Sequence, residues 1–316
     1  MSEIIVVGSI NMDLVVRIER APDGGETLSG FDFQTIPGGK GANQAVAAAR
    51  LGGNVFMIGM VGEDRFGSEL SEKLTQNQVN VSGVSLVNGI STGVAMIIVE
   101  EKGENRIIIV PGANGCLTVD AIDLYEKEFQ VYDTLVVQLE TPLETVIHAV
   151  SKAKQNQKIV IFNPAPAPRE KIPSDILGMI DFLVLNESEA KSMTGITVNT
   201  VEDGILASKK LHKSTGNTVI LTMGETGSIA LDSKGAWYVS AYKINAVDTT
   251  AAGDAFIGAI AVFHETKEIP ELIRWANAAG AIAATRLGAQ TSLPSLDDLR
   301  LFIRNNGQNV EIQKII

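Results

Sequence analysis

Short apolar segments alternate with longer helical segments along most of the chain after residue 54. The apolar segments have the length and composition of buried strands. They are residues 55–61, 134–139, 158–162, 182–185 and 218–222, and the helical segments are residues 66–76, 118–129, 142–155, 188–194 and 201–213. Strands that alternate with helices build a parallel sheet covered by helices on both faces. We therefore expect a three-layer αβα fold around a doubly wound, mostly parallel sheet, to which residues 4–8 add one more strand.

Two pairs of β-type segments depart from this alternation because no helix lies between their members. Such pairs predict a small antiparallel sheet that projects from the main domain. We see no internal repeat with a period of about 20 to 50 residues and no low-complexity linker. We therefore expect one domain over residues 1–316, with this small sheet inserted at residues 14–36 and 91–111. Its expected strands are residues 14–18 and 27–35, joined by the turn 22–25, and residues 93–100 and 106–110, joined by the turn 102–105.

The composition argues against nucleic acid and membranes as partners. The net charge is −11, the pI is about 4.9, and no cluster of Lys and Arg stands out. The single cysteine, Cys116, excludes an intrachain disulfide and suits a reducing compartment. We recognise neither a leader nor a membrane-spanning apolar run, so we expect a cytoplasmic protein. The histidines lack metal-ligand spacing and are expected to be surface or helix residues: His148, His212 and His264.

Residues 248–256 read D-T-T-A-A-G-D-A-F and predict an anion site. A β-type run at residues 237–247 leads into them, and an Ala-rich helical run at residues 255–263 leads out. The small residues Ala251, Ala252 and Gly253 leave backbone N–H groups uncovered at the helix N-terminus, where the helix dipole adds positive charge. Asp254, beside that site, is suited to take a proton from an alcohol that attacks the anion. The alternative is that Asp254 only caps the helix.

Residues 37–44 read P-G-G-K-G-A-N-Q and lead into an Ala-rich helical run at residues 45–51. This is not a phosphate-binding P-loop, because neither Ser nor Thr follows Lys40. It is not a dinucleotide fingerprint either, because Gln44 stands where the third glycine would be, which argues against a nicotinamide oxidoreductase. We expect the glycines to let the backbone approach a small ligand, and Asn43 to donate to and accept from sugar hydroxyls.

Polar side chains follow most of the predicted strands. Asn11 and Asp13 come after the first strand, where their side chains face the same way and suit a polar ligand, or form an Asx turn. Several polar strand ends on one parallel sheet predict a site along its carboxyl edge. The later strand ends carry Gln138, Glu140, Asn163, Asn186, Glu189 and residues 222–227.

The motifs D-T-x-A-A-G-D-x-F, followed by Gly258, and G-G-x-G-x-N at residues 38–43 resemble the two signatures of the ribokinase/PfkB family of sugar kinases. The resemblance covers nearly the whole chain. It implies ATP-dependent phosphorylation of the 5-hydroxyl of D-ribose with Mg²⁺ and K⁺, a small β-sheet that acts as a lid over the sugar, Asp254 as the base, and an anion hole formed by Ala251, Ala252 and Gly253.

The same resemblance implies the ligand contacts. The sugar would be held by Asn11, Met12, Asp13, Gly39, Lys40, Gly41, Ala42, Asn43, Glu140 and Asp254. The nucleotide would be held by Asn186, Thr222, Met223, Gly224, Glu225, Thr226, Gly227, Gly253, Asp254 and Asn277. A monovalent cation would be bound by Asp248, Ser292 and the carbonyls of Thr250, Ala283, Arg286 and Gly288. Glu189 would help to organise magnesium, or it would only be a first-turn helix residue favoured by the dipole.

Two alternatives to ribose phosphorylation remain. The first is a kinase of the same fold that acts on 2-deoxyribose, fructose or a nucleoside, although an aromatic content of only 5% argues against a nucleoside site. The second is a sugar-binding regulator without catalysis, which we would expect to lack the anion loop or its acid. Both Gly253 and Asp254 are present.

The lid segment at residues 94–99 predicts a homodimer. Both alternating sets of its side chains are apolar, so one set could cover the sugar while the other would face water. Phe31 and Phe33 add apolar area on the neighbouring expected strand. We expect two lids to pack together with two-fold symmetry, unless helices of the main domain bury this face.

Overall fold

The computed structural model describes residues 1–101, 105–168 and 170–315. Its main sheet has ten strands in the order β14-β13-β12-β11-β10-β9-β8-β1-β4-β5. The strands from β5 to β11 are parallel, and β12, β13 and β14 add an antiparallel edge. Their bounds are β1 Glu3–Val7, β4 Asn54–Gly62, β5 Val79–Val87, β8 Thr134–Val137, β9 Ile159–Phe162, β10 Phe182–Leu185, β11 Thr218–Thr222, β12 Gly227–Asp232, β13 Gly235–Ser240 and β14 Ile312–Lys314.

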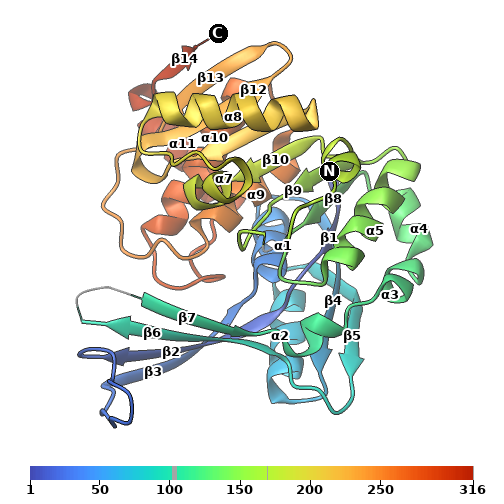
Figure 1. Ribbon diagram of the computed structural model, residues 1–316, viewed down its shortest axis with the longest axis vertical. Coiled ribbons are helices and arrows are strands. Elements are labelled where there is room, and N and C mark those ends of the chain that lie inside the picture. The colour runs from blue at the N-terminus through green and yellow to red at the C-terminus, as the bar shows by residue number, and fades with distance from the viewer. Residues whose placement is uncertain (102–104, 169, 316) are drawn as a thin grey trace.

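Helices cover both faces of this sheet (Figure 1), which confirms the expected three-layer fold. In β1, Ile4 and Val6 enter one apolar core, while Ile5 and Val7 enter the other, because successive side chains point to opposite faces. The first core is completed by α1 Lys40–Arg50, α2 Arg65–Gln76, α9 Ala252–Phe263, α10 Ile269–Ala284 and α11 Leu296–Asn306. The second is completed by α3 Val119–Asp123, α4 Glu126–Val131, α5 Leu143–Gln155, α6 Ser174–Leu177, α7 Glu187–Thr194 and α8 Val201–Thr215.

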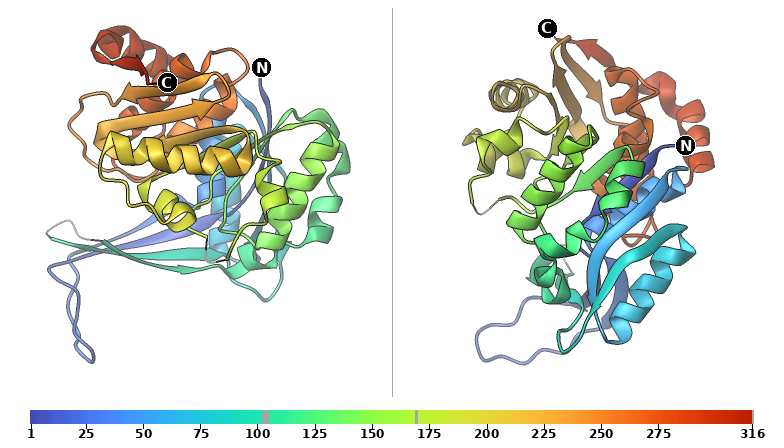
Figure 2. Two further views of the ribbon diagram at one scale, coloured as in Figure 1. Left: turned by 45° about the horizontal axis from the view of Figure 1, so that its top comes forward. Right: turned by 90° about the vertical axis from the view of Figure 1, so that its right-hand side faces the viewer.

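A second sheet of four strands projects from one end of the domain (Figure 2). We call it the lid. It consists of β2 Asn11–Ile18, β3 Asp32–Gly38, β6 Gly93–Glu100 and β7 Asn105–Val110. The expected antiparallel pairs, β2 with β3 and β6 with β7, are present, and a parallel pairing of β2 with β6 joins them. The expected turn at residues 102–105 falls largely on residues 102–104, which lie outside the described part of the chain.

Three local expectations were wrong. Residues 27–31 are not part of a strand, because the pairing of β2 with β3 ends at Arg17 and Asp32, although the Phe31 N–H still donates to the Arg17 carbonyl at 3.0 Å. The β-type run at residues 237–247 is a strand only to Ser240, where the pairing with β12 ends at Gly227. Residues 118–129 form two helices, since Tyr125 leaves helical geometry and packs its ring edge-on against Phe56.

None of the helices in the described part of the chain is long and apolar enough to cross a bilayer.

Candidate active site

A cleft of about 620 Å³ lies between the lid and the carboxyl ends of the parallel strands. The lid lines it with Asn11 and Asp13 of β2 and with inward-facing apolar residues of β6 and β7. The main domain lines it with the start of α1, the carboxyl ends of β10 and β11, residues that follow β8, β9 and β10, and the start of α9 with the loop before it. Of the residues predicted for the ligands, it contains Asn11, Asp13, Gly39, Lys40, Asn43, Glu140, Asn186, Glu189, Thr222, Thr250, Ala251, Gly253 and Asp254.

The glycines at the start of α1 have a role in packing as well as the role we expect toward a ligand. Gly39 has a φ of 89°, and a Cβ there would lie 2.7 Å from the backbone nitrogen of Asn11. A Cβ on Gly41 would lie 2.6 Å from the carbonyl carbon of Gly8. The glycines therefore let α1 begin directly against the chain that follows β1. Gly39 also lines the cleft, so the approach of its backbone to a ligand stays a prediction. This packing places the next side chains of α1 in and below the cleft.

Asn43 has one buried atom to offer a ligand. Its Nδ2 donates to Oδ2 of Asp254 at 3.0 Å. Its Oδ1 is buried and has no hydrogen-bond partner among the described residues. A buried amide oxygen is costly to leave unpaired, so this atom is suited to accept a hydrogen bond from a substrate hydroxyl.

Asn11 and Asp13 lie on the face of β2 that lines the cleft. Oδ1 of Asn11 accepts from Nδ2 of Asn114 at 2.7 Å. This bond identifies Nδ2 of Asn11 as the atom that can donate to a ligand. Burial, followed by the negative charges of Glu140 and Asp254, raises the pKa of Asp13 from 3.8 to about 7. Asp13 is therefore an acid whose charge depends strongly on what shares the cleft with it.

Glu140 and Lys40 meet at the start of α1. Oε2 of Glu140 accepts from the Ser9 hydroxyl at 2.5 Å and from the Lys40 backbone N–H at 3.1 Å. Burial acts to lower the pKa of the Lys40 ammonium, but the carboxylates of Asp254, Glu140, Glu189 and Asp13 outweigh it and raise that pKa. Lys40, which we had predicted only as a sugar contact, therefore remains a cation among four carboxylates.

The loop before α9 holds Asp254 and an open amide. Ala251 caps α9 in the left-handed region with a φ of 60°. The Ala252 N–H donates to the Thr249 carbonyl at 3.2 Å, whereas the structure gives the Gly253 N–H no partner among the residues it describes. A Cβ on Gly253 would meet no atom within 4 Å, so this position opens into the cleft. The Asp254 side chain beside it is only 8% exposed.

Asp248 ties together the two loops predicted to bind a monovalent cation. Its Oδ1 accepts from the Thr250 N–H and its Oδ2 from the Gly288 N–H, each at 2.9 Å. Burial acts to raise the pKa of Asp248, but hydrogen bonds from Thr250 and Gly288 outweigh it and lower that pKa, so the carboxylate remains ionised. Ser292 donates to the Ala289 carbonyl, and the Ala283 carbonyl accepts from the Arg286 N–H.

Asn186 and Glu189 form a capping box at the start of α7, so Glu189 is a first-turn helix residue, as the structural alternative predicts. The Glu189 carboxylate accepts from the backbone N–H and the side-chain amide of Asn186 at 2.9 and 3.1 Å. Burial raises the pKa of Glu189 despite these bonds. Glu189 also lines the cleft, so a role near a bound metal stays a prediction. Within the described ranges, no group of three or more His, Cys, Asp or Glu residues could hold a metal ion.

Several predicted ligand contacts do not line the cleft. Met12 and Ala42 are fully buried in the first apolar core, so their side chains cannot reach a sugar. Asn277 instead accepts from the Ser228 hydroxyl at 2.7 Å and donates to the Val239 and Ser240 carbonyls. The roles of the remaining residues stay predictions: Gly41, Ala252, Met223, Gly224, Glu225, Thr226 and Gly227.

Sequence reasoning missed the amides beneath Asp254. Gln44 Nε2 donates to Oδ1 of Asp254 at 3.0 Å, and Asn163 and Gln138 contact Gln44 in turn. The sequence identified Gln138 and Asn163 as polar residues at strand ends. Only the folded chain shows that both contact Gln44.

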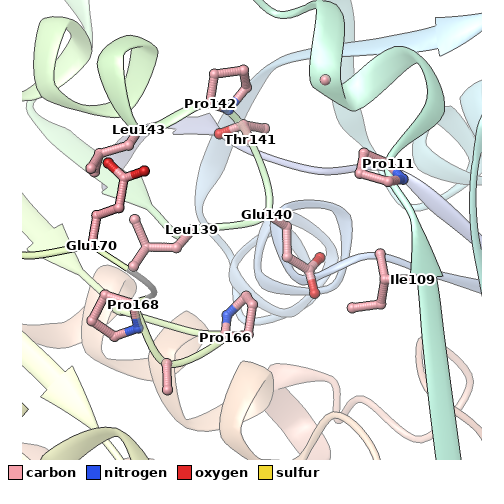
Figure 3. A pocket seen from close by; sticks show the side chains of 12 residues that line it. Ile109, Pro111, Leu139, Glu140, Thr141, Pro142, Leu143, Pro166, Pro168 and Glu170 are labelled. Carbon is pink, nitrogen blue, oxygen red and sulfur yellow. The ribbon is translucent and has the colours of Figure 1, made fainter. Parts of the chain in front are cut away.

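A second pocket of about 500 Å³ adjoins the cleft through Ile109, Glu140, Pro166 and Ala167. Figure 3 shows the Glu140 side chain between Ile109 of β7 and Pro166. Proline and leucine side chains form most of its remaining wall.

Known proteins resemble this chain in both sequence and structure. The pfkB family carbohydrate kinase pattern matches residues 1–296. A ribokinase from Schizosaccharomyces pombe is 42% identical, with 94% of this chain and 96% of the relative covered. A deoxyribokinase from Salmonella typhi is 37% identical, with 96% and 99% covered. The structure of Arabidopsis thaliana ribokinase complexed with ribose and ATP has a TM-score of 0.90 and 33% identity, covering 96% of this chain and 99% of that one.

We predict that Asp13 makes stability depend on pH when neither sugar nor ATP is added. Its folded pKa of about 7 lies above its ordinary value of 3.8, so the folded chain binds this proton more tightly than the unfolded chain. The resulting stability is fully present below the ordinary value and is lost as pH rises through the folded pKa. Between about pH 5 and pH 8, the wild type should lose about 1–3 kcal/mol relative to Asp13→Asn.

Urea unfolding of both proteins across this pH range measures the difference. Asp32→Asn, at an exposed carboxylate on the same lid, is the matched control and should follow the wild type. Parallel curves for the wild type and Asp13→Asn would show that Asp13 is not the titrating group.

Proposed function

Because this chain belongs to the pfkB family of carbohydrate kinases, we propose that its cleft transfers the γ-phosphoryl group of ATP to the 5-hydroxyl of D-ribose. The protein is an ATP-dependent sugar kinase. The observation that carries the assignment is the position of Asp254, which is buried at the N-terminus of α9 and lines the same cleft as the polar side chains Asn11 and Asp13 of the lid. The relatives include both ribokinase and deoxyribokinase, so 2-deoxyribose is the main competing acceptor.

In the proposed reaction, Asp254 accepts the proton of the 5-hydroxyl while that oxygen bonds to the phosphorus atom and the bond to ADP breaks. The N–H of Gly253 and the positive end of α9 stabilise negative charge on the phosphoryl group. The Lys40 ammonium lowers the repulsion between that charge and the carboxylates around it. Asn11, Asp13, Asn43 and Glu140 orient the sugar, and closure of the lid excludes water as a competing acceptor.

When magnesium is bound with the nucleotide, it would neutralise part of the negative charge of the phosphates. Both oxygens of Glu189 already accept from Asn186, so Glu189 suits an indirect role, through water, better than direct coordination. The oxygen-rich cleft wall and the net negative charge of its side chains fit a hard divalent cation.

The acceptor assignment is tested by coupled ADP release with D-ribose, 2-deoxyribose, D-fructose and a nucleoside. Ribose should have the highest kcat/KM, because a site built to bond a hydroxyl leaves polar groups unpaired when that hydroxyl is missing. Asp254→Asn should lower kcat by about 10²- to 10⁴-fold while ATP still binds. Near-native turnover in that variant would remove Asp254 as the base, and a preference for 2-deoxyribose would replace ribose as the acceptor.

We also propose a potassium site at Asp248, Ser292 and the neighbouring carbonyls. The ionised Asp248 already holds the loop that carries Ala251 to Gly253, so a cation there would steady the anion site. The rate should be higher in potassium than in tetramethylammonium at equal ionic strength, and Asp248→Ala should lose that response. Equal rates in the two salts would remove the proposal.

The outer face of the lid supports the proposed homodimer. Ala95 and Ile97 line the cleft, so the other set of side chains on β6 and β7 faces away from it. On that outer face Met96 is 49% and Ile108 is 58% exposed, and Phe33 on β3 is 62% exposed. Adjacent exposed apolar side chains of this kind mark an interface, and a second lid with the same face would cover them.

Light scattering should therefore show a dimer for the wild type and a monomer for Ile108→Lys, because a charge in an apolar interface is unpaired. Leu206→Lys, at a comparably exposed apolar side chain on α8, should remain a dimer. A wild-type monomer, or a dimeric Ile108→Lys, would show that the lids do not pair.

A further inference from the structure

Both oxygens of the Asp254 carboxylate are held by amide groups of α1. Asn43 Nδ2 donates to Oδ2, and Gln44 Nε2 donates to Oδ1, each at 3.0 Å. Asn43 lines the cleft, but Gln44 does not and is only 1% exposed. The contact of Gln44 with Asp254 is therefore separate from substrate binding.

The orientation of the Gln44 amide is determined by its neighbours on both sides. Its Oε1 accepts from Gln138 Nε2 at 2.6 Å. Its Nε2 lies 3.3 Å from Oδ1 of Asn163, whose own Nδ2 donates to the backbone carbonyl of Val184 at 3.0 Å. That carbonyl can only accept, so it orients Asn163, and Asn163 in turn requires a nitrogen from Gln44. A reversed Gln44 would place its oxygen against two other oxygens.

The fold makes room for this chain of amides at the ends of β1 and β8. A Cβ on Gly8 would lie 2.1 Å from Oε1 of Gln138, so any other residue at that position would displace the Gln138 amide. The Gln138 side chain is buried, at 1% exposure. Oε1 of Gln138 has no hydrogen-bond partner among the described residues, so Gln138 is held by this packing and by its bond to Gln44. Gln44 itself has polar partners on both sides, which hold its amide more rigidly than one hydrogen bond would.

We propose that Gln44, oriented by Gln138 and Asn163, is a positioning residue for Asp254. An aspartate in the first turn of a helix is otherwise free to rotate toward the exposed N–H groups of that turn and cap them. The Gln44 amide holds Oδ1 of Asp254 by a hydrogen bond from below the cleft. The carboxylate therefore stays directed at the acceptor hydroxyl. This role rests on the proposed function of Asp254 as the base.

The test compares Gln44→Met with the wild type in steady-state ADP release, using the acceptor with the highest turnover. Methionine keeps the length of the side chain but donates nothing to Asp254. We expect kcat to fall by about 10- to 100-fold, the size of a lost bond to a charged group. The KM for the sugar should change by less than about threefold, because Gln44 does not line the cleft.

The decisive measurement repeats Gln44→Met in an Asp254→Asn background, where no carboxylate remains to be positioned. The further loss in kcat should then disappear. A full additional loss in that background, or a raised KM with unchanged kcat, would overturn the proposal. Turnover of the wild type and its loss in Asp254→Asn test the proposed function without any change at Gln44. Failure of the base assignment is therefore distinguishable from failure of the positioning role.

Gln138→Met provides a second route if Gln44→Met folds poorly. Methionine at position 138 keeps the length of the side chain but donates nothing to Oε1 of Gln44, so Gln44 is then oriented by Asn163 without Gln138. We expect a loss in kcat that is smaller than for Gln44→Met, with the KM for the sugar changed by less than about threefold. Equal activity of Gln138→Met and the wild type would contradict the proposal. Ser208→Ala, at a buried hydroxyl on α8 that has no hydrogen-bond partner among the residues the structure describes, is the control for the general effect of altering a buried polar group.

Discussion

The cleft places four carboxylates around one ammonium group. Among the described residues that line it, Lys40 is the cation, and Asp13, Glu140, Glu189 and Asp254 are the acids. Buried like charges repel strongly, and the site lowers this repulsion in two ways. Asp13 takes up a proton readily, as its raised pKa shows, and Lys40 stays charged despite its burial. A polyanionic substrate would add to the same imbalance, which is a physical reason to expect metal cations with it.

The charge arrangement depends on the close packing of α1 against α9. Small residues make that packing possible: a Cβ on Gly258 of α9 would lie 2.5 Å from the Cβ of Ala47 on α1. The start of each helix then faces the same cleft, one bringing Lys40, Asn43 and Gln44, the other bringing Asp254. The small residues of both motifs thus allow this close helix packing.

The lid connects the acceptor site to the outer surface of the molecule. Its inner face carries Asn11 and Asp13 beside apolar side chains, so in the proposed function the same strands would supply both polar contacts to the sugar and a cover over it. Its outer face is apolar and exposed at Met96, Ile108 and Phe33. Pairing of lids would therefore restrain the strands that hold the sugar, and association and substrate binding would share one structural element.

The sequence alone predicted the layered αβα fold, the lid segments and the two motifs, because alternating apolar segments and local Gly-Ala-Asp patterns are short-range signals. It did not predict the antiparallel edge formed by β12 and β14 or the break at Tyr125, since these depend on which strand or ring lies alongside. Only tertiary structure brought Gln44 within hydrogen-bond distance of Asp254, 210 residues away, and surrounded Lys40 with carboxylates from other elements. Hydrogen bonds and pKa shifts arise from distances of a few ångströms, and the fold, not the order of residues, determines those distances.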